Sequence, residues 1–292
     1  MSENTTNPDF CRIDHLALIA IEGDDAAHFL QGQISADTVA LADGRWLRAV
    51  YCNPKGRILA SLIICRDDKR FFAVLARDIA DGIVARLKMF VMRAKVTITR
   101  LNALFAATAE KSPPPTGGGE ISRDGESFVL SGESFRFWPD LNSSVSVIAD
   151  NGDWLQNEIL RGVPWIAQAT QEMFIPQFVN FDLLHGINFK KGCYVGQEII
   201  ARLHYLGGVK KRGMILCGDG EAPQPGENLS AAGASPFAEI VNSSTVGGSF
   251  VSFAAVSKTA MGQELTWRDQ PLKIKPPPYG LPDEDAKKRP KI

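Results

Sequence analysis

Short apolar runs separated by polar turns dominate the first hundred residues. Runs of this length, bounded by Gly, Pro, Asn and Asp, are typical of β-strands, and short turns between them favour antiparallel pairing. The pattern predicts an antiparallel meander between residues 45 and 75. The expected strands are 16–21, 45–52, 57–65, 71–75 and 95–101.

Helical spacing of apolar residues appears both between and after these runs. From residue 77 to 92 they recur every three or four positions, which predicts an amphipathic helix of about four turns. Another helix is expected after a cap at Asp24 or Asp25, and a third over 153–160, before Gly162. Strands and helices are mixed along the chain, so the sequence predicts an α+β protein.

Changes in composition predict the domain boundaries. Residues 111–120 contain three prolines and three glycines, which suits a linker or exposed loop. After residue 207, short β-like runs alternate with Gly, Pro and Asn turns, as in a small β-barrel or sandwich. The expected units are a first α+β lobe (10–105), a second α+β lobe (120–206), a C-terminal β-barrel (207–275) and a Pro-rich charged tail (276–292). A strand is also expected over 144–150.

Composition and charge exclude several classes of protein. Hydrophobic residues make up 45% and charged residues 22%, which is close to the soluble globular average, and no apolar run approaches the ~20 residues of a membrane span. The first residues are polar and lack a secretory pattern, so a cytoplasmic location is expected. A net charge of -1 gives no general attraction to nucleic acid. The five cysteines are scattered, which favours free thiols.

One cysteine, Cys193, lies in a segment that suits a functional thiol. The sequence KKGCYVGQEIIAR (190–202) places it at or just before an expected helix start, beside two lysines and between two glycines. Helix amide ends and nearby cations favour a thiolate, and glycines let a ligand approach the backbone. A structural interpretation stands beside this one, because free cysteines are often small buried hydrophobic residues. Glu198 and Arg202 are, in the same way, either site residues or a solvated helix pair.

The helix expected in this segment has an apolar stripe and a basic neighbourhood. Val195, Ile199 and Leu203 are spaced to face inward, and a Gly-Gly pair follows. Lys190 and Lys191, with residues 210–212, form a basic cluster that suits either a solvated face or contact with an acidic tail or phosphate.

Other catalytic and binding motifs are missing from the sequence. The four histidines show no metal-ligand spacing, so no metal site is expected. GxGxxG, GxxxxGK[ST] and GxSxG do not occur, which disfavours dinucleotide, P-loop and serine-hydrolase chemistry.

The octapeptide KGCYVGQE (191–198) resembles the K-G-C-Y-x-G-Q-E signature of the YgfZ proteins. These folate-binding proteins are related to the glycine-cleavage T-protein and act in iron-sulfur cluster assembly or repair. Further segments resemble the other blocks of the family, and LHYLGGVKKR is similar to its mitochondrial branch. Those segments are 29–41, 52–60, 174–192 and 207–212, so the resemblance covers about residues 14–256.

The resemblance implies a fold and a set of site residues. The fold would be two ferredoxin-like lobes of the T-protein folate-binding type and a C-terminal β-barrel around a central hole, with tetrahydrofolate at the lobe face. Cys193 is then the functional thiol and Glu198, or Asp37, the available acid-base carboxylate. The implied cofactor-binding residues are Lys191, Gly192, Tyr194, Gly196, Gln197, Arg202, Gln33, Asp37, Lys55 and Arg57, with Gln31 near them and with Trp165, Tyr194 and Phe189 as stacking candidates.

One position departs from the T-protein pattern. The T-proteins that this chain resembles have an Arg-x-Glu-x-Gly run. The resemblance implies that the Glu carboxylate of this run accepts hydrogen bonds from the paired N–H groups of the pterin ring. Here Leu160 takes the place of that carboxylate and Glu158 lies two residues earlier. The departure weakens an aminomethyltransferase interpretation.

Three functions remain open on the sequence. The first is a tetrahydrofolate-binding accessory protein that supports iron-sulfur cluster assembly or repair, with folate and client or assembly proteins as partners and no direct contact with nucleic acid or membrane. The alternative is a folate-dependent one-carbon (aminomethyl) transferase. The third is an interaction scaffold that has kept the fold and lost the ligand.

Overall fold

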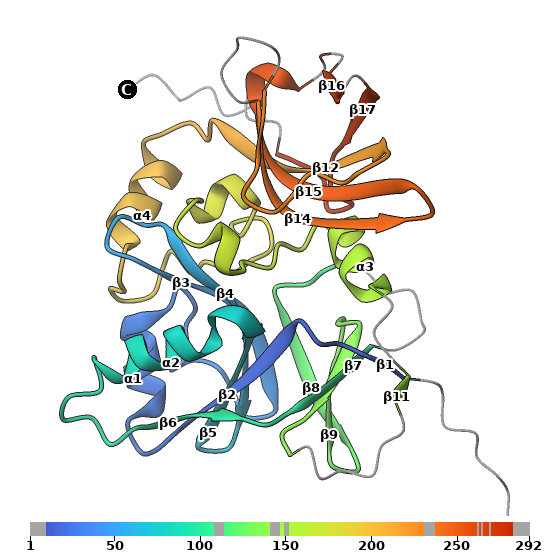
Figure 1. Ribbon diagram of the computed structural model, residues 1–292. Helices are drawn as coiled ribbons and strands as arrows, with labels where there is room; N and C mark the ends of the chain where they lie inside the picture. Colours follow the sequence, from blue (N-terminus) through green and yellow to red (C-terminus); the bar gives the residue numbers. More distant parts are fainter. Residues whose placement is uncertain are drawn as a thin grey trace, which may run out of the picture.

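The computed structural model describes residues 10–107, 114–140, 147–148, 152–230, 237–261, 263, 265–268 and 270–282. In these residues the chain forms two β-sheets, one above the other in Figure 1, with a largely irregular segment and helix α4 between them. No helix in this part of the chain is long and apolar enough to cross a membrane.

The predicted meander forms one half of the larger sheet. β3 (Arg45–Cys52), β4 (Ile58–Asp67) and β5 (Arg70–Ala76) pair antiparallel in sequence order, followed by β2 (Leu16–Glu22) and β6 (Thr97–Leu101). Side chains alternate across a strand. Ile19 and Ile21 of β2 therefore pack with the helices, and Leu18 packs on the opposite face. The helices on the first face are α1 (Ala26–Gln33) and α2 (Ala80–Lys88).

The same sheet continues into strands that come from both of the predicted lobes. β8 (Gly118–Asp124) pairs with β3, and then come β9 (Ser127–Leu130), β10 (Phe135–Trp138), β7 (Leu104–Ala107), β1 (Phe10–Arg12) and β11 (Val147–Ile148). All eleven strands form one sheet, so two separate ferredoxin-like lobes are not confirmed. The physical reason lies partly in Gly118, where a Cβ atom would come within 2.6 Å of the carbonyl oxygen of Trp46. The glycines expected in a linker let β8 pair closely with β3.

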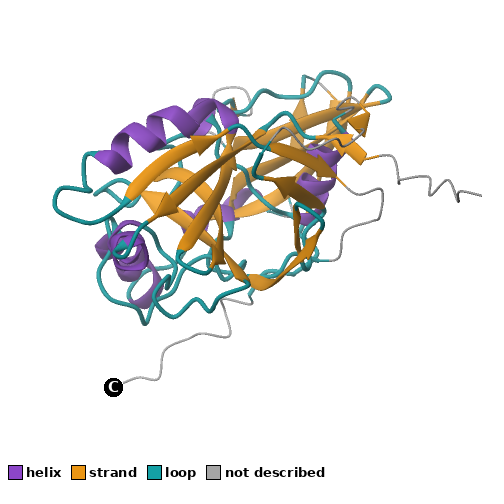
Figure 2. Ribbon diagram, turned by 90° about the horizontal axis from the view of Figure 1, so that it is seen from below, coloured by secondary structure: helices purple, strands orange, loops and turns teal. Residues whose placement is uncertain are grey.

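The predicted C-terminal β-structure is confirmed as a nearly closed barrel. Its strands are β12 (Lys211–Asp219), β13 (Asn228–Leu229), β14 (Ala238–Val246), β15 (Ser249–Ser257), β16 (Leu265–Trp267) and β17 (Gln270–Lys275). They pair in the order β13-β14-β15-β12-β17-β16 around a core that includes Leu216, Ile240 and Phe250. Figure 2 shows the strands of the molecule curving round its middle, with helices toward the outside.

Two helices flank the irregular segment 162–196, which is called the connecting segment below. α3 (Asp153–Arg161) ends at Gly162 in the left-handed conformation, as predicted. α4 (Gln197–Tyr205) has Gly196 as its N-cap, so Cys193, expected at or just before the helix start, lies in the loop that precedes the helix. The residues of the predicted inward stripe, Val195, Ile199 and Leu203, are half-buried, and Ile200 is the fully buried residue of α4.

Smaller differences concern 3-10 turns and chain ends. The helix expected over 77–92 is shorter and consists of η1 (Arg77–Ile79) and α2. The remaining turns are η2 (Gln168–Thr170), η3 (Pro176–Val179) and η4 (Lys258–Ala260). Parts of three predicted segments lie outside the described residues, namely 111–113 of the linker, 144–146 and 149–150 of the expected strand, and 283–292 of the tail.

Candidate functional site

Lys191 fixes the signature loop, here residues 188–196, to the first part of the chain. Its Nζ donates hydrogen bonds of 2.7 Å to each of the carbonyl oxygens of Gln31, in the last turn of helix α1, and of Ile34 and Ala36, just after it. The ammonium group also lies 5.2 Å from the ring centroid of Tyr194. Three donors directed at three carbonyls use the full hydrogen-bonding capacity of a lysine. Lys191 is therefore a structural clamp that brings two distant segments together.

Burial of this clamp changes its ionisation. Burial lowers the pKa of Lys191 to about 8, and the nearby carboxylate of Asp37 opposes the change. The phenol of Tyr194 is also buried, which raises its pKa, and its Oη has no hydrogen-bond partner among the described residues. Gln33, at the end of α1, likewise has a buried Oε1 without a partner there.

The pH dependence of stability tests the clamp. Replacement of Lys191 by Met is expected to lower the free energy of unfolding by about 2 kcal/mol at pH 7, because three buried carbonyl oxygens lose their donor. Between pH 8 and 10.5 the unfolded wild type holds a proton that the folded protein has lost, so its stability rises with pH over this window. The gap between wild type and variant should then widen, as measured by urea denaturation. The exposed Lys190→Met is the control, and a constant gap would contradict the prediction.

Backbone contact joins the other side of the loop to the turn at residues 53–56. A Cβ on Gly196 would lie 2.5 Å from the carbonyl oxygen of Asn53 and 3.0 Å from the Cα of Gly56. The Asn53 Oδ1 accepts hydrogen bonds from the backbone of Lys55 and Arg57, which holds the turn in shape. Gly196 was predicted to leave room for a ligand, but in the structure another segment of the chain occupies that space.

The thiol of the signature and its carboxylate Glu198 face outward. Cys193 and Gly192 are exposed, and Gln197 is half-buried as the first residue of α4. Glu198 and Arg202 form an ion pair of 3.1 Å with side chains that are 81% and 65% exposed. This geometry matches the solvated helix pair that the sequence left open.

A cavity of about 460 Å³, called the α4 cavity below, lies beside the end of α4. Its walls include Phe189, His204, Gln177, Asp182 and Arg212. The rings of Phe189 and His204 are stacked, with centroids 3.7 Å apart. Both oxygens of Asp182 accept hydrogen bonds of 2.9 Å from Arg212, so an aromatic wall and a buried ion pair share one space.

Gln177, which lines this cavity, has an unused acceptor that is buried in the protein interior. The side chain is fully buried, and its Nε2 donates to the carbonyl oxygen of Ile200 at 2.7 Å. Its Oε1 has no hydrogen-bond partner among the described residues. A buried acceptor without a donor costs about 1–3 kcal/mol.

A buried ion-pair cluster lies in the interior, between the large sheet and α3. It consists of Arg48, Glu133, Glu158 and Arg161, whose side chains are at most 4% exposed. Arg48 pairs with Glu133 at 2.5 Å, Arg161 bonds Glu158, and Arg161 also lies 3.4 Å from Glu133. Burial raises the pKa of Glu133 although the two arginines oppose it. Burial lowers the pKa of Arg161, but the two carboxylates outweigh it, so the net change is upward.

The tail contributes Tyr279 to this interior. Its Oη donates to the carbonyl oxygen of Gly162 at 2.9 Å and accepts from the Nδ2 of Asn180 at 3.0 Å. Burial raises the pKa of the phenol. The described part of the tail is therefore packed against α3 and η3.

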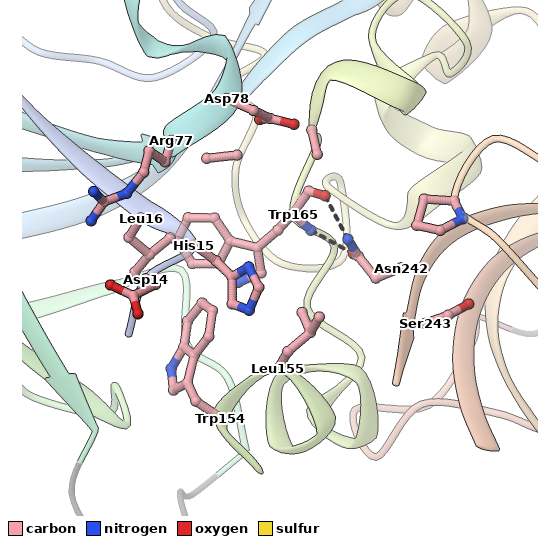
Figure 3. A pocket seen from close by; sticks show the side chains of 13 residues that line it. Asp14, His15, Leu16, Arg77, Asp78, Trp154, Leu155, Trp165, Asn242 and Ser243 are labelled. Atoms are coloured by element: carbon pink, nitrogen blue, oxygen red, sulfur yellow. Dashed lines mark hydrogen bonds between the residues drawn. The ribbon is translucent and has the colours of Figure 1, made fainter. Parts of the chain in front are cut away.

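Trp165 lies apart from the signature loop. Its Nε1 donates to Glu158 at 3.0 Å, and its backbone exchanges hydrogen bonds of 2.9 and 2.8 Å with the side chain of Asn242 in the barrel. Trp165 and Trp154 line a second cavity of about 420 Å³, shown in Figure 3 and called the tryptophan cavity below. Cys193 lines neither of the two cavities.

Comparison with known proteins decides the family, although no family model matches the chain. The "tRNA-modifying protein YgfZ" of Klebsiella pneumoniae (strain 342) is 33% identical over 242 residues, which is 74% of each chain. Proteins of the same name from Pectobacterium carotovorum subsp. carotovorum (strain PC1) and Escherichia coli O157:H7 (strain EC4115 / EHEC) are 31% identical over 247 and 243 residues. These matches cover 76% and 74% of this chain, and 74% of each relative. This chain belongs to the YgfZ family.

The fold of this YgfZ-family chain is similar to that of a T-protein. The glycine cleavage system aminomethyltransferase T from Bartonella henselae aligns with a TM-score of 0.66, covering 93% of this chain and 86% of that chain. The sequence identity is 15%, so the likeness describes the fold alone. At the position where the sequence departs from T-proteins, Leu160 is 46% exposed, whereas Glu158 is buried and bonded to Arg161.

The structure adds polar residues that sequence reasoning missed. Gln177 and Asp182 face the α4 cavity, and Arg48, Glu133 and Arg161 build the buried cluster. Arg48 alone carried a signal, because it is a charge within an otherwise apolar strand run. Among the described residues, no group of three His, Cys, Asp or Glu side chains could hold a metal ion.

Proposed function

We propose that this chain is a cytoplasmic, tetrahydrofolate-binding protein of the YgfZ type that supports iron-sulfur cluster assembly or repair in client enzymes. The observation that carries the proposal is the 33% sequence identity between this chain and a YgfZ relative, over about three quarters of the chain. An exposed thiol at Cys193, in a loop that Lys191 holds in place, supports a role for this thiol at the surface.

The α4 cavity supports the folate part of the proposal. Its volume lies in the range of sites for drug-sized ligands. A reduced pterin is a bicyclic ring system with N–H donors, which suits the ring of Phe189 and the carboxylate of Asp182. Each oxygen of Asp182 keeps a lone pair after bonding Arg212. Bound tetrahydrofolate supplies a carrier for one-carbon units, and these residues bind and orient its ring.

Affinity measurements on cavity variants test this placement. Tetrahydrofolate is expected to bind the wild type, and Phe189→Leu and Asp182→Asn are each expected to weaken binding about tenfold, by loss of ring stacking and of a charged acceptor. The matched control is Ala167→Leu, which fills the tryptophan cavity instead. Isothermal titration calorimetry measures all four proteins.

The outcomes separate the two cavities. If Ala167→Leu is the one variant that loses binding, the folate site is the tryptophan cavity, where the predicted stacking residue Trp165 lies. Absence of binding to the wild type would remove folate from the proposal. The remaining predicted contacts on the signature side, including Gln33, Asp37, Lys55 and Arg57, become secondary targets for the same titration.

Cys193 is the proposed functional thiol. Stable iron-sulfur clusters take several thiolates, so a single cysteine serves as a shared, transient ligand or as a redox thiol. The relatives are called tRNA-modifying proteins, and we assign that property, for this chain, to a cluster-dependent client enzyme that modifies tRNA. With Cys193→Ser, tRNA modification by such a client under oxidative stress is expected to fall severalfold, with Cys11→Ser as control. Unchanged modification would exclude Cys193 from the mechanism.

The T-protein fold favours aminomethyl transfer as a second candidate function. That reaction needs a positioned acid-base carboxylate, and Glu198 and Asp37 are the candidates. Formation of methylene-tetrahydrofolate from an aminomethyl donor, absent in Glu198→Gln or in Asp37→Asn, would support it. Lack of turnover with saturating folate would exclude aminomethyl transfer, and the accessory function would be the one that remains.

A further inference from the structure

The loop between α2 and β6, residues 89–96, carries three large apolar side chains that are exposed to solvent. They are called the apolar tip below, and their exposed fractions are 67% for Met89, 43% for Phe90 and 90% for Met92. Figure 1 shows this loop, in teal, at the outer edge of the molecule, beyond the end of α2. The loop shares no residue with the connecting segment, the α4 cavity or the tryptophan cavity. Large apolar side chains that cluster on a surface mark an interaction site.

The fold holds this loop in one conformation. The backbone N–H groups of Met89, Phe90 and Val91 donate hydrogen bonds of 3.2, 3.0 and 3.3 Å to carbonyl oxygens in the last turn of α2. The side chain of Val91 packs against the core on the helix side of the sheet. Val91 therefore anchors the loop, while its two neighbours are exposed. A preformed loop pays little ordering entropy when it binds a partner.

Met92 has a backbone conformation that does not suit its side chain. Its φ is 42°, in the left-handed region that residues with a Cβ rarely adopt. Glycine is the residue that suits such a position. Met92 thus combines a backbone cost with a side chain that is almost completely exposed. Outliers of this kind cluster at functional sites.

Positive charge flanks the apolar tip. Residues 82–96 contain four basic residues and no acidic residue. The side chains of Lys88, Arg93 and Lys95 are exposed, and none of them has a partner in the described part of the chain. Arg86, the fourth basic residue, is half-buried beside Tyr51. The loop therefore presents apolar side chains together with three unpaired cations.

The carboxylates near the base of the loop are already engaged. Asp25 accepts a hydrogen bond of 2.8 Å from the backbone N–H of Lys95. Asp24 and Glu22, in and before the same turn, each form an ion pair with a basic residue at or next to the start of β5. The protein itself therefore does not neutralise the three cations, which favour an anionic partner.

The size and shape of this surface favour a lipid bilayer over a folded protein. A stable protein interface buries about 800 Å² on each partner, roughly 20–30 residues, which is far more than three side chains provide. A bilayer needs no matching shape, because apolar side chains enter its headgroup region. Its anionic lipids attract cations over about a Debye length. Protruding apolar side chains beside unpaired cations suit such a surface in both respects.

We propose that the loop 89–96 binds the surface of an anionic lipid bilayer, with the apolar tip in the headgroup region and the three cations at the lipid phosphates. Peripheral binding of this kind needs no membrane-spanning segment. The sequence did not predict this contact. It is independent of the proposed folate site and of the thiol at Cys193.

Vesicle co-sedimentation of the full chain tests the charged part of the proposal. The probe is vesicles of equimolar phosphatidylcholine and phosphatidylglycerol, and vesicles of phosphatidylcholine alone are the neutral comparison. The wild type is expected to bind the neutral vesicles at least about tenfold more weakly, because each cation near an anionic surface contributes about fivefold. Lys88→Gln with Arg93→Gln should weaken binding to the anionic vesicles about 25-fold. The matched control, Lys273→Gln with Lys275→Gln, removes two exposed cations from β17 and should change nothing.

Met92→Gly tests the apolar part. Glycine suits the left-handed φ, so the variant should be as stable as the wild type while its binding to anionic vesicles falls about tenfold. Leu160→Ser, which removes an exposed apolar side chain from α3, is the control and should bind as the wild type does. Circular dichroism checks that each variant is folded.

Three results would overturn the proposal. The first is no binding of the wild type to the anionic vesicles, which would leave an acidic protein as the partner to seek. The second is equal binding by the wild type and the variant without Lys88 and Arg93. The third is equal binding by the wild type and Met92→Gly, because the apolar tip would then not enter the bilayer.

Discussion

Replacement of Glu158 by Ala is expected to lower the free energy of unfolding by about 3–5 kcal/mol. Glu158 is fully buried and accepts hydrogen bonds from Arg161 and from the Nε1 of Trp165. Removing the carboxylate leaves a buried guanidinium with one fewer counter-charge and an indole N–H without an acceptor. The loss is large because a buried charge without its partner keeps its desolvation cost. Urea denaturation measures it.

Two further variants identify the cause of this loss. Glu198→Ala removes an exposed carboxylate that pairs with Arg202, so a change below about 0.5 kcal/mol is expected. The double variant Glu158→Leu, Arg161→Met removes both charges and should cost less than the sum of the two single replacements. Additive losses would show that the two side chains do not stabilise one another.

Local pattern predicted the elements of this fold well where a strand or helix depends on its own residues. The meander over 45–75 and the helix ended by Gly162 are examples, because apolar spacing and turn residues act over a few positions. The joining of β8 to β3 was missed, since it brings together residues more than seventy positions apart. A single sheet and two separate lobes have the same local pattern, and pairing between distant strands decides between them.

The candidate site shows the same limit. The signature 191–198 was found from sequence, but the clamp of Lys191 on residues 31–36 depends on contacts across about 160 positions. Gln177 and Asp182 carry no motif, and their significance comes only from an unpaired oxygen and a cavity. Buried polar residues of this kind are recognised from their partners, which a sequence without an alignment does not identify.

Replacement of Gly196 by Ala is expected to lower the free energy of unfolding by about 3 kcal/mol, from backbone strain together with a steric clash. Gly196 has a φ of 82°, a region that side chains with a Cβ rarely adopt. The added Cβ would also lie 2.5 Å from the carbonyl oxygen of Asn53, which is backbone and cannot rotate away. The strain would separate the start of α4 from the turn at 53–56.

Gly192 is the matched control in the same loop. A Cβ at Gly192 meets no atom within 4 Å, so Gly192→Ala should change stability by less than about 0.5 kcal/mol. The pair of variants therefore distinguishes packing from ligand access as the reason for glycines on either side of Cys193. If Gly192→Ala keeps full stability but loses client activity, the exposed side of the loop is a contact surface. If Gly196→Ala is as stable as the wild type, the close packing of the loop on Asn53 does not hold the two segments together.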